Sequence, residues 1–432
     1  MTSLNETPRG ERLHIGIFGR RNAGKSSLLN AITGQNAAIV SPVKGTTTDP
    51  VFKAMELLPI GPVVLIDTPG IDDYGELGQL RIEKTRNILR KTDIALLVVD
   101  SEEGLHDEDS ALIDIFNETG VKYLIVYNRA KRVSRPSLPS HDRTSEDFKR
   151  NKTARPLPRG FNTFYNKSDA STNPDGICVN ALTGENTYEL KEKIAEVSSD
   201  VRETHRLVAD LLSPGDVTIL VIPVDKAAPK GRLILPQQQV IRDILDSGNI
   251  AIVARETELT DTLQKIKCTP KLVITDSQVF DKVSKETPEN VGLTSFSILM
   301  ARYKGVLEQA VRGAEFIDTI KDGDKILISE GCTHHRQCDD IGTVKLPRLI
   351  EKYTGAKPIY EFTSGGGFRH DLSDYKMIVH CGGCMLNARE MNYRHRVAKE
   401  LNVPITNFGV AISHMQGILK RCISPFHNLQ NK

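Results

Sequence analysis

Apolar runs that end in glycine-rich or polar turns recur through the first half of the chain. They cover residues 14–18, 63–66, 94–99 and 122–127. Continuous rather than alternating apolar runs are typical of parallel strands buried on both faces. Residues 27–32, which end at Gly34, and residues 188 to about 205 have the pattern of helices. We therefore predict an α/β domain with a mostly parallel sheet over residues 1–203.

The same alternation of strands and helices continues in the second half. Predicted strands at 216–222, 249–253 and 271–275, with a helix at 237–245, indicate a small α/β domain over residues 204–290. It carries no phosphate loop or catalytic cluster, so by elimination we assign it to dimerisation. A third α/β domain, over residues 291–432, is predicted from helices at 296–303 and 305–316, strands at 324–330 and 375–379, and a helix from residue 385.

Composition excludes several classes of protein. The length of 432 residues suits two to four domains, and a net charge of +2 with 26% charged residues gives no overall attraction to nucleic acid or membrane. No apolar run approaches the roughly 20 residues of a membrane span, and the N-terminus has no signal-peptide core. Seven unevenly spaced cysteines argue against a secreted disulfide framework. We expect a cytoplasmic protein.

The turn after the first strand matches the phosphate-binding pattern GxxxxGK[ST]. Strand, glycine-rich loop and helix follow one another as this motif requires. Lys25 is expected to reach the β- and γ-phosphates, and the Ser26 hydroxyl to bind Mg²⁺. The expected phosphate-binding residues are Gly19, Asn22, Ala23, Gly24, Lys25, Ser26 and Ser27.

Three later motifs favour GTP over ATP. Asp67 begins a DxxG motif that ends at Gly70, with Asp67 expected to act on Mg²⁺ through water and the Gly70 N–H to meet the γ-phosphate. Residues 45–49 have the pattern of a switch segment, with Thr47 or Thr46 on Mg²⁺. The guanine-binding residues are expected to be Asn166, Lys167 and Asp169 of an NKxD motif, with Asn180 and Ala181. Lys25, Thr47 and Gly70 are the predicted catalytic residues.

These motifs resemble the TrmE/Era/EngA class of GTPases. In that class Asn22 and the GTTxD switch imply activation by a monovalent cation, usually K⁺. Residue 71 is Ile, which cannot orient the attacking water, so we expect slow intrinsic hydrolysis. Arg20 and Arg21 are either charge stabilisers or solvated loop residues, and the second interpretation is favoured.

A basic segment separates the strand at 122–127 from the NKxD motif. Residues 128–165 carry ten Lys or Arg against three Asp or Glu, and they include four prolines. Such a composition predicts a disordered insertion or an intervening sequence translated in error. Removing it would join the strand directly to Asn166.

Two cysteine motifs near the C-terminus form a candidate metal site. Cys332 and His334 belong to a CxH motif, and Cys381 and Cys384 to an HCxxC motif. Such a set suits zinc or an iron–sulfur cluster, whereas buried packing cysteines or a redox dithiol are the alternatives. His334, Asp225 or water could supply a fourth ligand. His335 and His380 could support the ligands from behind, Cys338 is a poorly placed thiol, and a helix start near Cys384 would favour its thiolate.

The order of these domains and motifs resembles the HydF family of [FeFe]-hydrogenase maturation GTPases. The resemblance implies a [4Fe–4S] cluster on Cys332, Cys381 and Cys384 with a variable fourth ligand. It also implies a homodimeric scaffold that receives a diiron precursor from the radical-SAM maturases HydE and HydG and delivers it to the hydrogenase apoprotein. A GTPase acting on ribosome or tRNA, and a zinc-stabilised GTPase without cluster chemistry, are the alternative functions.

Overall fold

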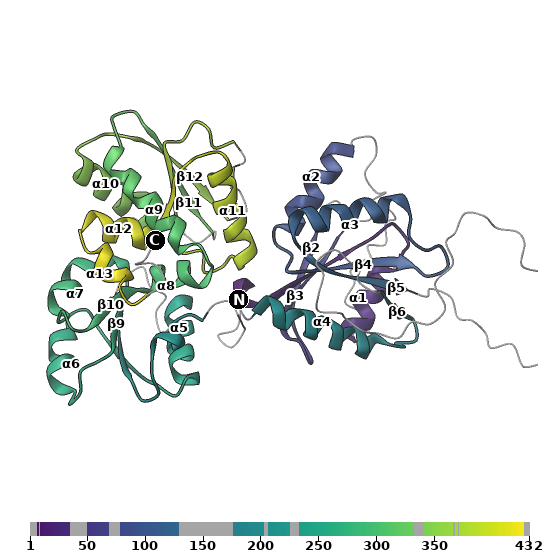
Figure 1. Ribbon diagram of the computed structural model, residues 1–432, viewed down its shortest axis with the longest axis horizontal. Coiled ribbons are helices and arrows are strands. Elements are labelled where there is room, and N and C mark those ends of the chain that lie inside the picture. The colour runs from purple at the N-terminus through teal and green to yellow at the C-terminus, as the bar shows by residue number, and fades with distance from the viewer. Residues whose placement is uncertain are drawn as a thin grey trace, which may run out of the picture. The chain divides into compact units, whose positions relative to one another are not determined.

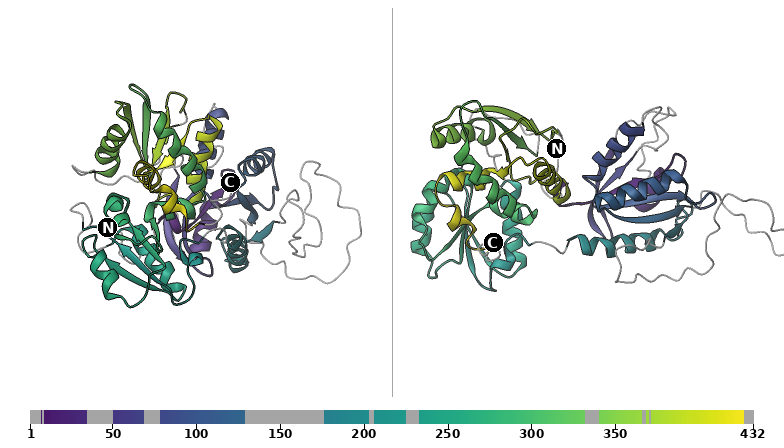
Figure 2. Two further views of the ribbon diagram at one scale, coloured as in Figure 1. Left: turned by 60° about the vertical axis from the view of Figure 1, so that its left-hand side comes forward. Right: turned by 45° about the horizontal axis from the view of Figure 1, so that its top comes forward.

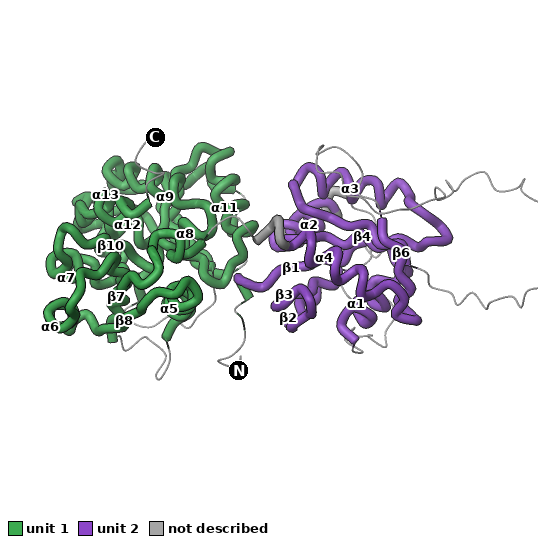
Figure 3. Tube along the Cα trace, turned by 60° about the horizontal axis from the view of Figure 1, so that its bottom comes forward, with its two compact units in different colours: residues 1–10, 204–432 green, residues 11–203 purple. Residues whose placement is uncertain are grey.

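The computed structural model describes residues 7, 9–34, 50–68, 78–128, 176–202, 206–224, 233–331, 340–365, 368–369 and 371–426. The chain divides into two compact units (Figure 3). One unit comprises residues 11–203, and the other comprises residues 1–10 together with 204–432. The second unit thus includes residues that the sequence assigns to the domain over 1–203, among them the described residues Arg9 and Gly10.

A six-stranded sheet forms the centre of the unit of residues 11–203 (Figure 1). Its strand order is β2-β3-β1-β4-β5-β6, and every neighbouring pair is parallel except β2 with β3. The strands are β1 (Leu13–Phe18), β2 (Val51–Leu57), β3 (Gly61–Asp67), β4 (Ile94–Asp100), β5 (Lys122–Asn128) and β6 (Ile177–Val179). The helices of this unit are α1 (Lys25–Thr33), α2 (Gly78–Leu89), α3 (Asp107–Thr119) and α4 (Thr187–Arg202), and the short segment η1 (Arg9–Glu11) lies at the division between the two units in sequence.

Side chains of the central strands point alternately into two cores. Leu96 of β4 packs in one core with Leu28 of α1, whereas its neighbour Leu97 packs in the other with Phe116 of α3. Burial on both faces explains why these strands are apolar without interruption. The predicted strands at 14–18, 63–66, 94–99 and 122–127 are confirmed as β1, β3, β4 and β5. The sequence does not predict β2, because most of its side chains are only half-buried at the sheet edge.

Two four-stranded parallel sheets form the centre of the second unit. The sheet of order β10-β9-β7-β8 contains β7 (Val217–Val221), β8 (Ile250–Ala254), β9 (Leu272–Thr275) and β10 (Gly292–Ser295). The sheet of order β12-β11-β13-β14 contains β11 (Lys325–Glu330), β12 (Ile359–Ser364), β13 (Met377–His380) and β14 (Ile405–Asn407).

Helices surround both sheets of this unit (Figure 1). The α-helices are α5 (Leu235–Asp246), α6 (Leu259–Lys265), α7 (Phe280–Glu286), α8 (Phe296–Tyr303), α9 (Leu307–Ala314), α10 (Leu346–Thr354), α11 (Ala388–Glu400), α12 (Phe408–Met415) and α13 (Leu419–Ile423). The shorter helical segments are η3 (Ala209–Leu211), η4 (Ser277–Val279), η5 (Glu315–Thr319) and the π-helical turn η6 (Ile341–Lys345).

The boundary between the middle and last domains lies later than the sequence predicts. A division between residues 290 and 291 would fall before β10, but β10 pairs with β9 and completes the middle sheet. The strand is short and ends in Thr294 and Ser295, so it has no long apolar run to reveal it. The middle domain therefore includes residues 292–295.

The last sheet is covered on both faces. Along β11, Ile326 and Ile328 belong to the large core, whereas Leu327 belongs to a smaller core that includes Ala398 of α11. The views of Figure 1 and Figure 2 agree that α11 lies on one side of this sheet and α10 on the other. The carboxyl ends of β11 and β13, which carry the cysteine motifs, therefore lie between helical layers. None of the helices in the described ranges is long and apolar enough to cross a membrane.

Candidate nucleotide and metal sites

The phosphate loop, residues 19–26, joins β1 to the first turn of α1. The Lys25 ammonium is buried and donates hydrogen bonds to the carbonyl oxygens of Gly19 at 2.9 Å and Arg20 at 2.8 Å. These bonds hold the loop in a closed curve at the N-terminus of α1, where unpaired N–H groups and the helix dipole favour phosphate. The predicted loop residues 19 and 22–27 therefore lie together as the motif requires.

Left-handed backbone shapes this loop. Gly24 has φ +89°, and a Cβ atom there would lie 2.0 Å from the side-chain nitrogen of Asn128. Asn22 also has positive φ, at 64°, a conformation that Asn tolerates better than most residues. A larger residue at Gly24 would displace Asn128 as well as strain the turn.

Asp67 ends β3 near the phosphate loop. Burial raises the pKa of its carboxyl group, and the Lys25 ammonium opposes this shift. A divalent cation would favour the ionised carboxylate. The sharing of one Mg²⁺ by Asp67 and Ser26 stays a prediction.

The buried amide of Asn128 connects two segments of the nucleotide site. Its Nδ2 donates to the carbonyl oxygen of Ala23 at 3.2 Å, and its Oδ1 accepts from the N–H of Ala181 at 3.1 Å. Asn128 ends β5, so the strand itself places this bridge beside the phosphate loop. The sequence does not predict this role, because the complete NKxD motif lies at 166–169. The feature that points to Asn128 is the strand that ends at this residue.

The segment after β6 is held by its own side chain. The Asn180 Oδ1 atom accepts from the N–H groups of Leu182 at 3.1 Å and Thr183 at 3.2 Å. Asn180 therefore organises the turn, and the N–H of Ala181 is directed to Asn128. This arrangement brings Asn180 and Ala181 to the site.

Arg20 is not a solvated loop residue, contrary to the favoured interpretation of the sequence. Its guanidinium pairs with Glu103 at 2.8 Å and with the buried Asp109 at 3.3 Å. These carboxylates lie at and before the start of α3, so Arg20 ties the phosphate loop to that helix.

Several predicted site residues lie outside the described ranges. They are Thr46, Thr47, Gly70, Asn166, Lys167, Asp169, Asp225, Cys332, His334, His335 and Cys338.

The cysteine turn, residues 380–384, follows β13 at the carboxyl edge of the last sheet. The Cys381 sulfur accepts hydrogen bonds from the N–H groups of Gly331 at 3.0 Å and Gly383 at 3.4 Å. Gly331, the residue that follows β11 and precedes Cys332 in sequence, therefore contacts the cysteine turn at the end of β13. Gly383 has φ +63°, and a Cβ atom there would lie 2.4 Å from the Met391 sulfur, so only glycine allows the turn to pack on α11.

Burial disfavours free thiolates in this turn. Loss of solvation raises the pKa of Cys381, and it raises the pKa of Cys384 to about 11. The prediction that a helix start favours the Cys384 thiolate is wrong, because α11 begins only at Ala388 with Asn387 as its cap. A bound cation would have to release both protons.

His380 has both ring nitrogens occupied. Its Nδ1 lies 2.7 Å from the carbonyl oxygen of Cys381, and its Nε2 lies 3.0 Å from Nη1 of Arg394. The fully buried imidazole has its pKa lowered well below the usual value by burial and by the Arg394 charge. His380 therefore supports the turn and does not offer a nitrogen to a metal.

The start of the chain packs against the same turn. A Cβ atom on Gly10 would lie 2.6 Å from the Cys384 carbonyl oxygen, and the buried Lys304 ammonium donates to the Gly10 carbonyl at 3.3 Å. This contact accounts for the assignment of Gly10 to the second unit.

The donor chemistry of the turn fits an iron–sulfur cluster. Two thiols lie together, one of them already accepts two backbone N–H groups, and hydrogen bonds of this kind tune cluster thiolates. Within the described ranges, which do not include Cys332, no three His, Cys, Asp or Glu residues converge into a metal-binding group.

Comparison with known families matches most of the chain. Residues 14–129 match a family described as 50S ribosome-binding GTPase. Residues 207–305 match the hydrogen maturase F dimerization domain, and residues 308–425 match the hydrogen maturase F tetramerization domain.

Individual curated relatives match part of the chain. GTPase Der from Crocosphaera subtropica is 37% identical over 147 residues, which are 33% of this chain and 32% of that protein. The tRNA modification GTPase MnmE from Desulforamulus reducens is 35% identical over 133 residues, which are 31% of this chain and 28% of that protein. The chain thus spans about a third of the length of these curated relatives. The similarity to the solved structure of Era from Aquifex aeolicus has a TM-score of 0.31 at 17% identity and covers 56% of this chain and 92% of that one.

The sheet, the phosphate loop and the matched GTPase model define the first unit as a P-loop GTPase domain. Two further α/β domains follow it in the second unit. With those two domains matched by its own models, the chain belongs to the hydrogen maturase F family.

Proposed function

We propose that this protein is a GTP-hydrolysing scaffold that holds a [4Fe–4S] cluster and delivers a diiron precursor to [FeFe]-hydrogenase. Lys25 and Ser26 would hold the phosphates and Mg²⁺, with Asp67, Thr47 and Gly70 completing the site. Lys25 already lies at the helix N-terminus where the β- and γ-phosphates bind. K⁺ would be held near Asn22 and would offset the charge that develops during hydrolysis.

Guanine recognition would divide between two segments. Lys167 and Asp169 are the proposed readers of the base, together with Asn180 and Ala181. Asn128 would support these segments with its amide, because it contacts Ala23 and Ala181. Asn166 itself lies outside the described residues.

The cluster would be held by Cys332, Cys381 and Cys384. The observation that carries this proposal is the pair of N–H groups, from Gly331 and Gly383, directed at the Cys381 sulfur at the end of β13. The cluster would supply an iron with an open coordination position, for which His334 is a candidate ligand. HydE and HydG would be the donors of the precursor, and the hydrogenase apoprotein the acceptor, in the cytoplasm.

Anaerobic reconstitution with iron and sulfide tests this function. We expect about four irons per chain and a [4Fe–4S] electron paramagnetic resonance signal after reduction. Stoichiometric zinc with no such signal would instead identify a closed structural site and contradict the proposal.

The middle domain would form a homodimer along the edge strand β8. Ile250 and Val253 of this strand are 51% and 49% exposed, and β8 has only one neighbour in its sheet. An exposed apolar edge strand pairs readily with a second copy. Sedimentation of a Val253→Lys variant should show a smaller species than wild type. The control variant Lys265→Ala, on the exposed end of α6, should sediment like wild type. An unchanged mass for Val253→Lys would exclude β8 as the dimer interface.

A further inference from the structure

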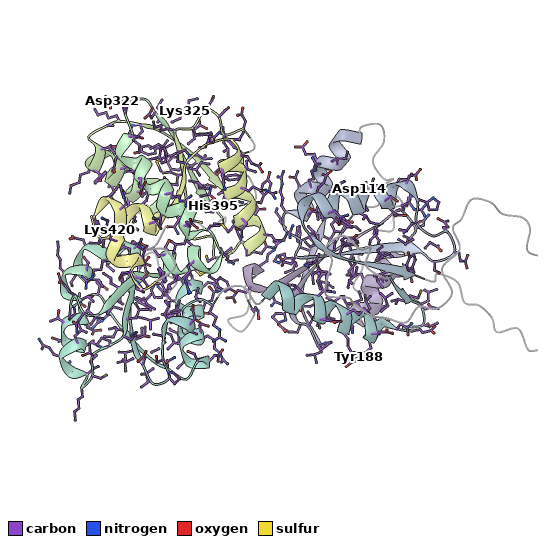
Figure 4. All side chains as sticks on the ribbon, in the orientation of Figure 1. Asp114, Tyr188, Asp322, Lys325, His395 and Lys420 are labelled. Carbon is purple, nitrogen blue, oxygen red and sulfur yellow. The ribbon has the colours of Figure 1, made fainter. Side chains whose placement is uncertain are left out.

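Arg394 is a fully buried guanidinium directly behind the cysteine turn. It projects from α11, whose buried positions 391, 394, 395 and 398 form one face of the helix. Figure 4 places His395, its neighbour on this face, within the second unit. An unpaired buried charge is strongly unfavourable, so the role of Arg394 is indicated by the groups that pair with it.

The partners of Arg394 come from three separate parts of the chain. Its Nε donates to Glu390 Oε1 at 2.9 Å, within α11. Its Nη1 reaches His380 Nε2 at 3.0 Å, and its Nη2 donates to the Gly365 carbonyl at 2.8 Å. The guanidinium also lies 5.0 Å from the centre of the Phe368 ring. One residue therefore links α11, the end of β13 and the glycine-rich segment after β12.

Donor chemistry fixes the tautomer of His380. Arginine can only donate hydrogen bonds, so the His380 Nε2 atom must accept. The imidazole proton is then on Nδ1, from which it donates to the Cys381 carbonyl at 2.7 Å. The result is a directed chain of hydrogen bonds from Arg394 through His380 to the peptide that carries Cys381.

We propose that Arg394 is a positioning residue for the metal site, which holds His380 as the Nδ1–H tautomer and locks the cysteine turn to the segment that begins at Gly365. The hydrogen bonds of Arg394 do not depend on the proposed function. The expected effect on cluster retention rests on that proposed function. A lysine at this position could keep a charge but could not reach His380, Glu390 and Gly365 together, because it lacks the planar fork of donors.

The tautomer can be measured in the metal-free protein. Two-bond nitrogen–proton spectra of full-length protein labelled at histidine nitrogens should show Nδ1–H for His380, with the signal assigned by its loss in His380→Gln. In Arg394→Met the proton should move at least partly to Nε2. Retention of the Nδ1–H form in Arg394→Met would overturn the proposal.

Cluster retention gives the second readout. After reconstitution, Arg394→Met should lose iron to a chelator about tenfold faster than wild type or more, the usual effect of removing a group that orients a ligand. Arg394→Lys should lie between the two. The matched control is Arg396→Met, because Arg396 lies on the same helix but is exposed and pairs with Glu400. Equal iron loss from the Arg394→Met and Arg396→Met proteins would also overturn the proposal.

The two readouts separate this inference from the proposed function. If the wild-type protein takes up no iron, the cluster function fails, while the histidine spectra still decide whether Arg394 sets the tautomer. Circular dichroism identifies a variant that fails to fold, in which case Arg394→Lys carries the comparison.

Discussion

The phosphate loop follows β1 at the carboxyl edge of one parallel sheet, and the cysteine turn follows β13 at the carboxyl edge of another. Both use glycine with positive φ to bring backbone N–H groups toward a ligand. The phosphate loop places the Lys25 ammonium beside a helix N-terminus, a site that attracts an anion. The cysteine turn instead buries two thiols before α11 begins, and burial raises the pKa of both, so only a bound cation would favour their thiolate forms.

The comparison shows that similar backbone at a strand end can serve opposite charges. The two sites differ in the side chains that follow the strand, which are Lys25 in one and the two cysteines in the other. They also differ in the buried residue that supports the turn. Asn128 supports the phosphate loop through neutral hydrogen bonds, whereas Arg394 supports the cysteine turn with a buried charge. If this comparison is right, a substitution that abolishes the function of one site should leave the function of the other unchanged.

The largest expected effect comes from Lys25→Ala. Removing the ammonium should lower kcat for GTP hydrolysis about 100-fold or more, because it stabilises charge on the transferred phosphoryl group. Iron uptake should not change. A phosphate-release assay tests the predicted loss of hydrolysis, and iron analysis on the same preparation tests the unchanged iron uptake. Iron loss in this variant would contradict the independence of the two sites.

Cys381→Ser is the reciprocal variant. It should retain about tenfold less iron after desalting, because a thiolate ligand is lost, with GTP hydrolysis unchanged. Cys268→Ser is the matched control, since Cys268 is exposed and outside the site. Full iron content in Cys381→Ser would remove this residue from the ligand set.

Asn128→Ala sharpens the description of the nucleotide site. Loss of two buried hydrogen bonds should raise the Kd for GDP about tenfold, measured by fluorescence with a labelled nucleotide. Asn166→Ala should have a smaller effect. A larger effect of Asn166→Ala would show that Asn166 contributes more to GDP binding than Asn128 does.

Replacing K⁺ by Na⁺ should slow hydrolysis several-fold, up to about tenfold. In Asn22→Gly, which keeps the left-handed backbone but removes the amide, the two salts should give similar rates. An equal response of both proteins to the salt would exclude Asn22 from cation binding.

The smallest effect concerns stability of the metal-free second unit. Burial lowers the pKa of His395 from the usual 6.5 to about 4. Between pH 4 and pH 6.5, the unfolded state therefore binds a proton at this residue that the folded state does not bind. Stability should therefore fall as pH drops from 6.5 to 4, by roughly 3 kcal/mol at most. His380 acts in the same direction, so His395→Leu should lessen the pH dependence of urea midpoints without abolishing it. A slope unchanged in His395→Leu would contradict this cause.

The sequence predicts the strand that precedes each candidate site. Continuous apolar runs locate β1 and β13, and the GKS and HCxxC patterns follow directly. Asn128 was missed because its contacts with Ala23 and Ala181 depend on the sheet, which brings residues about 105 positions apart together. Arg394 was missed because arginine usually lies on the surface, and only the fold shows its burial.

Mössbauer spectroscopy of full-length protein reconstituted with enriched iron tests the central claim most directly. The account predicts that most of the iron in the wild-type protein gives the signal of a [4Fe–4S] cluster, and that this signal is lost in Cys381→Ser but kept in Lys25→Ala. Mononuclear iron alone in the wild type, or a cluster signal that survives Cys381→Ser, would contradict it.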